Sequence, residues 1–308
     1  MKKIPILSLA TILLCFILTG CKSSDYKKAI ALEGAGDYSA ALEIYVGILD
    51  YKDSANRIAL CEEMISAIDG YEAAKASAEE KNIALDTEIS GAEGVIAKGE
   101  KPLYSTLIPA LETAISKTKS EKVSIPEMPN TAEEINKIAD ELNNIDYDEI
   151  IEKLHTHQSN LETSIKQYSL VNAPSEAYVI QCLSKVTNIV DISAVTEDND
   201  PNGNLNKAGG YTAQVYFTSD LVNQGSVIGS TVIEKGTVAG GSIEVYANVK
   251  DAEKRNEYLA TFDGSFFDSG SHTVIGTVLV RTSDKLTASQ QKEMEANIIA
   301  ELINIENY

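Results

Sequence analysis

Apolar residues recur every three or four positions through the first half of the chain, which is the spacing of amphipathic helices. Residues 26–53 predict two short helices joined at Gly36-Asp37, because glycine readily takes the left-handed conformation that ends a helix. Asp53 is expected to cap a third helix that continues through Ile58 and Ile65. The chain therefore opens with a helical hairpin followed by a longer helix.

The helical spacing returns in two further stretches, at 83–96 and 103–118. Gly91, Gly94 and Gly99 are expected to mark breaks, since glycine weakens a helix interior. The sequence therefore predicts several separate helices in this region.

Proline residues make 120–130 the clearest internal connection. Thr131 and Glu134 then form a capping-box pattern that opens the next helix. A further start at Asp146 leads into a long apolar stripe that ends near Tyr168. These signals extend the helical half to residue 172.

After Ala173 glycine becomes frequent and alternating strand patterns appear. The expected elements are a helix over 175–186, strands over 189–195, 211–219, 232–233 and 242–249, a helix over 251–262, a strand over 273–282 and a final helix from 287 to 303. In the strand at 211–219, one face is expected to carry Tyr211, Ala213, Val215 and Phe217. This order predicts one sheet covered by helices, so the fold class is α+β.

The N-terminus has the pattern of an export signal. Lys2 and Lys3 precede an apolar stretch over 4–17, which is short for a transmembrane helix. Leu18-Thr19-Gly20-Cys21 then resembles the bacterial lipobox, in which the cysteine is diacylated and becomes the new N-terminus. The sequence therefore predicts a protein held at the outer face of the cell membrane through a diacylglyceryl anchor on Cys21.

Four parts follow along the chain. Residues 1–20 are the expected lipoprotein signal peptide, and 21–64 resemble one tetratricopeptide-like helical hairpin. A single copy is visible, whereas stacked repeats need about three to bury a continuous core. Residues 65–172 are expected to form a helical bundle or spacer, and 173–308 the α+β domain.

Charge narrows the range of partners. The chain holds 26 basic and 46 acidic residues, and removal of the signal peptide changes the net charge from −20 to −22. Both halves of the exported chain are acidic, which excludes nucleic acid as a partner because its phosphates require a basic surface. Of the cysteines, Cys61 and Cys182 remain unassigned and are expected to be buried free thiols, with a bridge between them left open.

The segment from Asp198 to Leu205 matches the first half of an EF-hand calcium loop. Its candidate Ca²⁺ ligands are Asp198, Asp200, Asn202 and Asn204. The match fails at the twelfth position, where Gly209 replaces the bidentate glutamate. A hydrogen-bonded turn between strands uses the same residue types, so both interpretations stay open.

Glu244, Arg255 and Arg281 are the candidate ligand-binding charges of the C-terminal domain, with internal salt bridges as the alternative. The common hydrolase and nucleotide-binding motifs are absent from the sequence. The sequence therefore favours a non-enzymatic binding or protein-interaction module. The alternative is an extracytoplasmic hydrolase that would use carboxylates together with His272, the one histidine of this domain. The candidate carboxylates are Glu197, Asp198, Asp200 and Glu244.

With these motifs in view, the mature chain resembles a group of Gram-positive lipoproteins often labelled EbhA. The residues that carry the resemblance are the lipobox, Gly36-Asp37-Tyr38, Tyr51-Lys52-Asp53-Ser54, Thr196-Glu197, Asp200-Pro201-Asn202, Gly209-Gly210-Tyr211-Thr212, Gly240-Gly241-Ser242-Ile243-Glu244-Val245-Tyr246, Asp251-Ala252, Arg255, Tyr258-Leu259 and Val278-Leu279-Val280-Arg281. The resemblance implies the envelope location and the domain layout. The partner expected for a binding module at that location is an envelope protein or glycan. It implies no catalytic residue.

Overall fold

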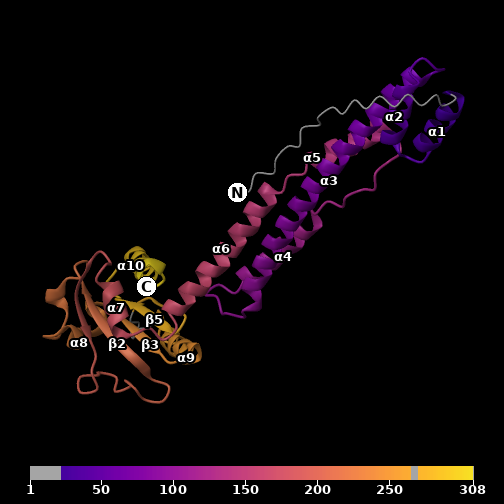
Figure 1. The fold of residues 1–308 in the computed structure, drawn as a ribbon. Helices are drawn as coiled ribbons and strands as arrows, with labels where there is room; N and C mark the ends of the chain where they lie inside the picture. The colour runs from indigo at the N-terminus through magenta and orange to yellow at the C-terminus, as the bar shows by residue number, and fades with distance from the viewer. Residues whose placement is uncertain (1–21, 265–269, 308) are drawn as a thin grey trace. The chain divides into compact units, whose positions relative to one another are not determined.

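The computed structural model describes residues 22–264 and 270–307 (Figure 1). The predicted signal peptide and Cys21 lie outside the described residues. The chain forms two compact units, one containing the residues up to Asp86 together with Lys122–Tyr147, the other Thr87–Glu121 together with Asp148–Tyr308. Helices and one antiparallel sheet confirm the α+β class. No helix in the described part of the chain is long and apolar enough to cross a membrane.

The predicted N-terminal hairpin is present as α1 (Lys22–Gly34) and α2 (Tyr38–Gly47). Gly36 takes a φ of 81° between them, and the Asp37 side chain accepts a hydrogen bond from the Ala40 N–H to cap α2. Buried apolar side chains join the hairpin to the start of the next helix, among them Ala29, Ala41, Tyr45, Ile48 and Cys61.

The third helix, α3, runs without interruption over Ser54–Ala97. The breaks predicted at Gly91 and Gly94 are therefore wrong. Both glycines lie on the exposed side of the helix, with open space where a Cβ would be, so they remove no packing contact. The left-handed Gly99, with φ 65°, follows the helix end as expected.

The remaining helices of the first half follow the predicted pattern. They are α4 (Leu107–Ser120), α5 (Ala132–Asn143) and α6 (Asp148–Leu170). Thr131 caps α5 by accepting a hydrogen bond from the Glu134 N–H, and Pro109 lies in the first turn of α4, where its missing N–H does no harm.

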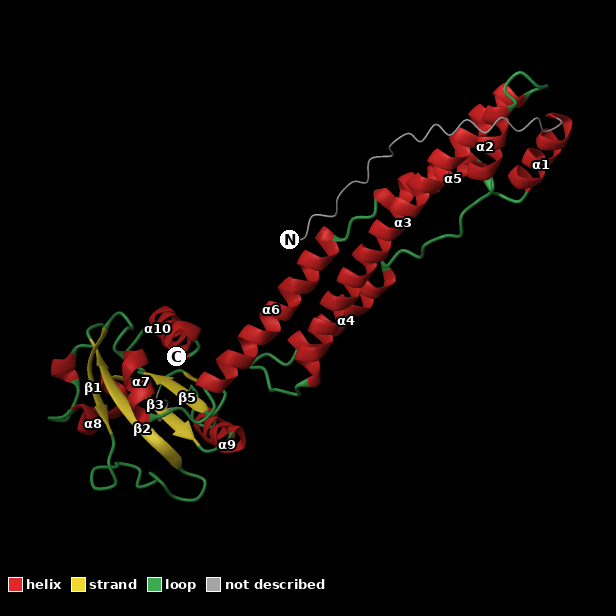
Figure 2. Cartoon of the chain, viewed as in Figure 1, coloured by secondary structure: helices red, strands yellow, loops and turns green. Residues whose placement is uncertain are grey.

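The C-terminal half contains five antiparallel strands in the order β1-β2-β3-β5-β4 (Figure 2). They are β1 (Ile189–Ala194), β2 (Tyr211–Ser219), β3 (Gly240–Tyr246), β4 (His272–Ile275) and β5 (Val278–Thr282). The single strand predicted over 273–282 is in fact the β4–β5 hairpin. Gly276 makes the turn with a φ of 58°, and a Cβ there would lie 2.4 Å from the Val171 carbonyl oxygen.

Helices cover both faces of this sheet. On one face, α7 (Glu176–Leu183) and α10 (Ala288–Leu302) bury Val179, Leu183 and Ile298 against Val215 and Phe217. On the other, α9 (Val249–Ala260) packs Ala252 and Leu259 against Tyr211, Tyr246 and Leu279. The first of these cores also contains Val171, which precedes the predicted domain boundary at Ala173. Cys61 and Cys182 are buried and free, as expected.

Two local predictions in the sheet region are wrong. The short strand expected at 232–233 belongs to the helix α8 (Val232–Lys235), which a complete capping box between Thr231 and Glu234 stabilises. Tyr211 does not share a face with Ala213, because the β2–β3 register shifts between these two residues. The shift brings Tyr211 against Tyr246 in an edge-to-face contact, with ring centroids 6.4 Å apart.

Candidate functional site

Glu244 lies at the centre of the sheet and is fully buried. Alternation along β3 turns its side chain to the face that α9 covers. Arg281 donates from Nη1 to Oε1 over 2.9 Å, while Arg255 Nε donates to Oε2 over 3.2 Å. The Tyr246 hydroxyl also donates to Oε2, over 2.6 Å. The three charged side chains predicted to bind a ligand therefore do converge, but they form ion pairs with one another.

This cluster satisfies the buried carboxylate with two cations and a hydroxyl. It corresponds to the internal salt-bridge alternative, and it leaves Glu244 unsuited to act as a general base. Burial, followed by the negative charge of Glu244, raises the pKa of Tyr246 above its ordinary value. Of the two arginines, Arg255 is the more exposed, and its guanidinium lies 5.4 Å from the Tyr258 ring centroid.

The polar face of β2 is buried as well, which its alternating pattern did not indicate. Gln214 and Tyr216 are almost fully buried, and the Gln214 amide donates to the Tyr216 hydroxyl over 3.0 Å. Gln214 lies opposite Glu244 in the β2–β3 register, so the ionic cluster continues into a polar layer. An alternating pattern indicates which face of the sheet a side chain occupies, but it does not indicate whether a helix covers that face.

Asp200 organises the loop that resembles a calcium site. Its Oδ1 accepts the Asn202 N–H and the Tyr211 hydroxyl, and its Oδ2 accepts the N–H groups of Asn204 and Leu205. Burial acts to raise the pKa of Asp200, but the hydrogen bonds from Tyr211 and the main chain outweigh it and hold the pKa below its usual value.

This geometry favours the hydrogen-bonded turn over the Ca²⁺ site. A calcium loop turns its carboxylate oxygens toward the ion, whereas Asp200 directs both of its oxygens to N–H and O–H donors of its own loop. Asn202 and Asn204 contribute main-chain N–H groups to that network. Within 22–264 and 270–307, no three His, Cys, Asp or Glu side chains are grouped to hold a metal ion.

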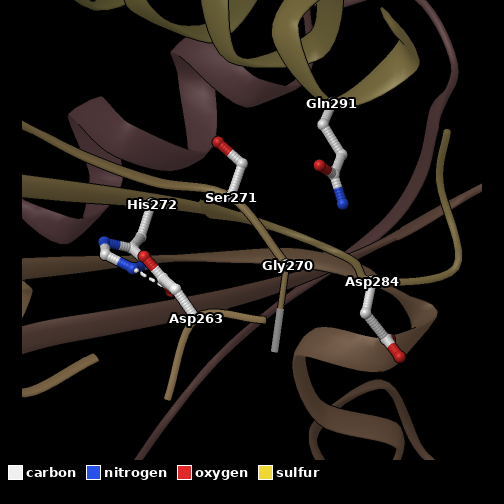
Figure 3. A pocket seen from close by; sticks show the side chains of 6 residues that line it. All are labelled: Asp263, Gly270, Ser271, His272, Asp284 and Gln291. Atoms are coloured by element: carbon white, nitrogen blue, oxygen red, sulfur yellow. Dashed lines mark hydrogen bonds and ion pairs between the residues drawn. The ribbon is translucent and has the colours of Figure 1, made fainter. Parts of the chain in front are cut away.

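A polar pocket of about 370 Å³ opens beside β4 (Figure 3). It is lined by Asp263, Gly270, Ser271, His272, Asp284 and Gln291. His272 forms one wall, with Nδ1 2.6 Å from Asn256 Oδ1 and Nε2 3.1 Å from Asp263 Oδ1. A Cβ on Gly270 would lie 2.0 Å from the Thr282 carbonyl oxygen, so only glycine fits at this point of the wall.

Two side chains of this pocket donate hydrogen bonds within the domain. The Ser271 hydroxyl donates to Glu295 over 2.6 Å, and the Gln291 amide donates to the Ser283 carbonyl over 2.9 Å. Two carboxylates also line the pocket: Asp263, whose Oδ1 lies 3.1 Å from His272 Nε2, and Asp284, whose Oδ2 lies 2.7 Å from the Lys285 ammonium. A carboxylate has more lone pairs than these contacts use, so the lining offers a ligand mainly the remaining acceptor positions of the two carboxylates and the amide oxygen of Gln291. Such a pocket is complementary to hydroxyl or ammonium groups.

The hydrolase alternative gains little from these contacts. Ser271 donates to Glu295, so its hydroxyl is not directed at His272 as a nucleophile activated by that ring would be. Among the carboxylates considered, Glu244 and Asp200 are engaged as described, and Glu197 accepts a hydrogen bond from the Asn206 amide. The sequence indicates His272 only as a candidate of the hydrolase alternative, and it contains no signal for Asp284 and Gln291, because only the fold brings these residues together.

Comparison with protein-family models, curated proteins and solved structures finds no match to this chain. The functional conclusion therefore rests on the chain's own residues.

Proposed function

We propose that the protein is a lipid-anchored, extracytoplasmic envelope protein whose C-terminal domain is a non-enzymatic binding module. The observation that carries the proposal is the lipobox Leu18-Thr19-Gly20-Cys21, which follows a short basic and apolar leader. Cleavage before Cys21 would place the acyl chains one residue from the start of α1 at Lys22. The proposed location of the protein is the outer face of the cell membrane.

The acceptor-lined pocket beside His272 supports the binding part of the proposal. Its carboxylates suit a hydroxyl- or ammonium-bearing group, which envelope glycans and proteins both present. The buried cluster around Glu244 serves the fold instead, since each of its charges faces another. The proposal thus assigns ligand binding to the pocket residues and stabilisation of the core to the cluster around Glu244.

Cys21→Ala is expected to abolish membrane anchoring, because the substitution removes the thiol that carries the acyl chains. The measurement is the distribution of the full-length protein between membrane and soluble fractions, together with the mass of its N-terminal peptide. The wild type should sediment with membranes and carry a diacylglyceryl mass. A wild-type protein that is cleaved elsewhere, or that lacks the lipid mass, contradicts the anchor.

Replacing Asp284 and Gln291 together by alanine is expected to weaken binding of the mature protein to purified cell-wall glycan by about tenfold, the equivalent of one charged and one neutral hydrogen bond. The matched control is Lys292→Ala, which changes an exposed neighbour on α10 outside the lining. Equal binding by the double variant and the wild type would argue against this pocket. Cleavage of the glycan by the wild type would favour the hydrolase alternative.

A further inference from the structure

Net charge is distributed unevenly along the mature chain. Residues 22–57, which form the hairpin and the start of α3, contain five basic and six acidic side chains, whereas 58–308 contain 19 basic and 40 acidic ones. The segment next to the proposed lipid anchor is thus close to neutral. Almost the whole negative charge lies further along the chain.

Internal ion pairs neutralise several of the hairpin's acidic groups. Glu33 accepts from Arg57 over 2.8 Å and from the Tyr45 hydroxyl over 2.8 Å. Asp53 is also paired with Arg57, at 3.1 Å, and Asp50 lies 2.5 Å from the Lys22 ammonium. These pairs reduce the negative charge that the hairpin presents to its surroundings.

The outward face of α1 carries lysines and small residues. This face is formed by the exposed residues Ser24, Lys27, Lys28, Ala31 and Gly34, while Lys22, which is also exposed, pairs with Asp50 and is not counted in it. The opposite face buries Ala29 and packs Tyr26 and Ile30 into the hairpin core. Neither Lys27 nor Lys28 has a side-chain hydrogen bond or ion pair with another described residue, while the one acidic residue of the first turn, Asp25, is half-buried on the flank.

We propose that this face of α1, defined by Ser24, Lys27, Lys28 and Ala31, lies on anionic phospholipid headgroups. The inference rests on the proposed lipidation of Cys21, which would hold α1 at the bilayer without an intervening linker. Lysines close to an anionic surface are attracted to it, and tethering raises the local concentration of headgroups around them. Ser24 and Ala31 are short enough to let both ammonium groups reach that surface.

The charge pattern also fits this orientation. Residues 58–308 would be repelled by the same headgroups, so only the near-neutral hairpin tolerates contact with them. Lys52 is not part of the face, because its ammonium lies 4.4 Å from the Tyr26 ring centroid. The lipid chains would supply the affinity, and the two lysines the orientation.

The test uses the mature lipidated protein carrying Ala31→Cys, reconstituted in vesicles of phosphatidylcholine alone or of an equal mixture with phosphatidylglycerol. A membrane-impermeant maleimide reports exposure of position 31, against the background of the buried Cys61 and Cys182. Labelling is expected to be about fivefold slower in the mixed vesicles, in line with the attraction expected for a lysine near an anionic surface.

The variant Lys27→Glu/Lys28→Glu should abolish this protection, whereas Lys137→Glu, at a side chain that is 77% exposed on α5, should leave it intact. Vesicle flotation separates the two proposals. A protein that does not float lacks the anchor and contradicts both. A protein that floats and is labelled equally in both kinds of vesicle contradicts the α1 face alone, as does protection that survives charge reversal.

Discussion

Glu244→Ala is expected to lower the free energy of unfolding of the sheet-containing unit by about 3–5 kcal/mol, because it leaves two arginines without their shared carboxylate. Arg281 suffers most, since its side chain is only 8% exposed and cannot reach water without distorting β5. The measurement is urea unfolding of the mature protein followed by circular dichroism. The matched control is Glu197→Ala, an exposed carboxylate, which should change stability by less than about 0.5 kcal/mol.

The pH dependence of the free energy of unfolding tests the same cluster through the ionisation of Tyr246. Burial, and after it the charge and hydrogen bond of Glu244, raise the pKa of Tyr246 above its ordinary value of 10.0. A raised folded-state pKa contributes stability that is complete below the unfolded-state pKa and is lost as pH rises above it. The wild type should therefore lose stability above about pH 10, and Glu244→Ala should lose less over that range. Parallel loss in both proteins, or a stability change under about 1 kcal/mol at neutral pH, would contradict this role of Glu244.

Gly241→Ala is expected to destabilise the same unit by about 3 kcal/mol, through overpacking at the centre of the sheet. Gly241 lies opposite Phe217 in the β2–β3 register, and the aromatic ring covers the glycine. A Cβ at this position would lie 2.3 Å from Phe217 Cζ and 2.3 Å from the Arg281 carbonyl oxygen. The ring could turn aside, but the carbonyl belongs to the adjacent strand β5 and cannot move without breaking the pairing.

Gly91→Ala supplies a control with the opposite expected sign. Gly91 belongs to the same compact unit, in the interior of α3, and has open space where a Cβ would be. Alanine there should stabilise the unit by about 1 kcal/mol, the difference in helix propensity between the two residues. Both variants are measured by the same urea unfolding. Destabilisation by both, or a neutral effect at Gly241, would show that the close approach around β3 does not limit packing.

The sequence predicted best those features that depend on neighbouring residues. Thr131 caps α5 as its capping-box spacing predicts, because an N-cap hydrogen bond joins groups three residues apart. The helices expected from 175 and from 287 also begin there, with Ser175 and Thr287 as their N-caps. The strand over Tyr211–Ser219 has the predicted bounds for the same reason, since alternation is a local pattern. The α+β class follows from the order of such elements.

Two of the errors arose where a distant contact decides the local structure. The β4–β5 turn forms at Gly276, packed against Val171, which lies more than 100 positions away in the chain. Similarly, the register shift next to Tyr211 is visible only when β2 is paired with β3. None of these outcomes has a signature in the residues immediately around it.

The candidate functional residues show the same difference between local and long-range information. Residue type and spacing alone indicated that Glu244, Arg255 and Arg281 were important charges, and that Asp200 belonged to a turn or a cation loop. Their roles depend on which groups face them. In the fold, Glu244 forms ion pairs with Arg255 and Arg281 against the sheet. Both carboxylate oxygens of Asp200 accept hydrogen bonds from donors of its own loop.

The sequence by itself determined the acidic balance, the helical first half and the α+β second half, and it contains the lipobox-like pattern on which the proposed anchor rests, because each of these depends on composition or on residues close together in the chain. Only the tertiary structure decided that the charged candidates stabilise the core, that Asp284 and Gln291 line one pocket with His272, and that Lys27 and Lys28 of α1 face outward. These outcomes depend on pairings between residues from separate helices and strands, and the free energy of such a pairing exists only once the chain has brought both partners together.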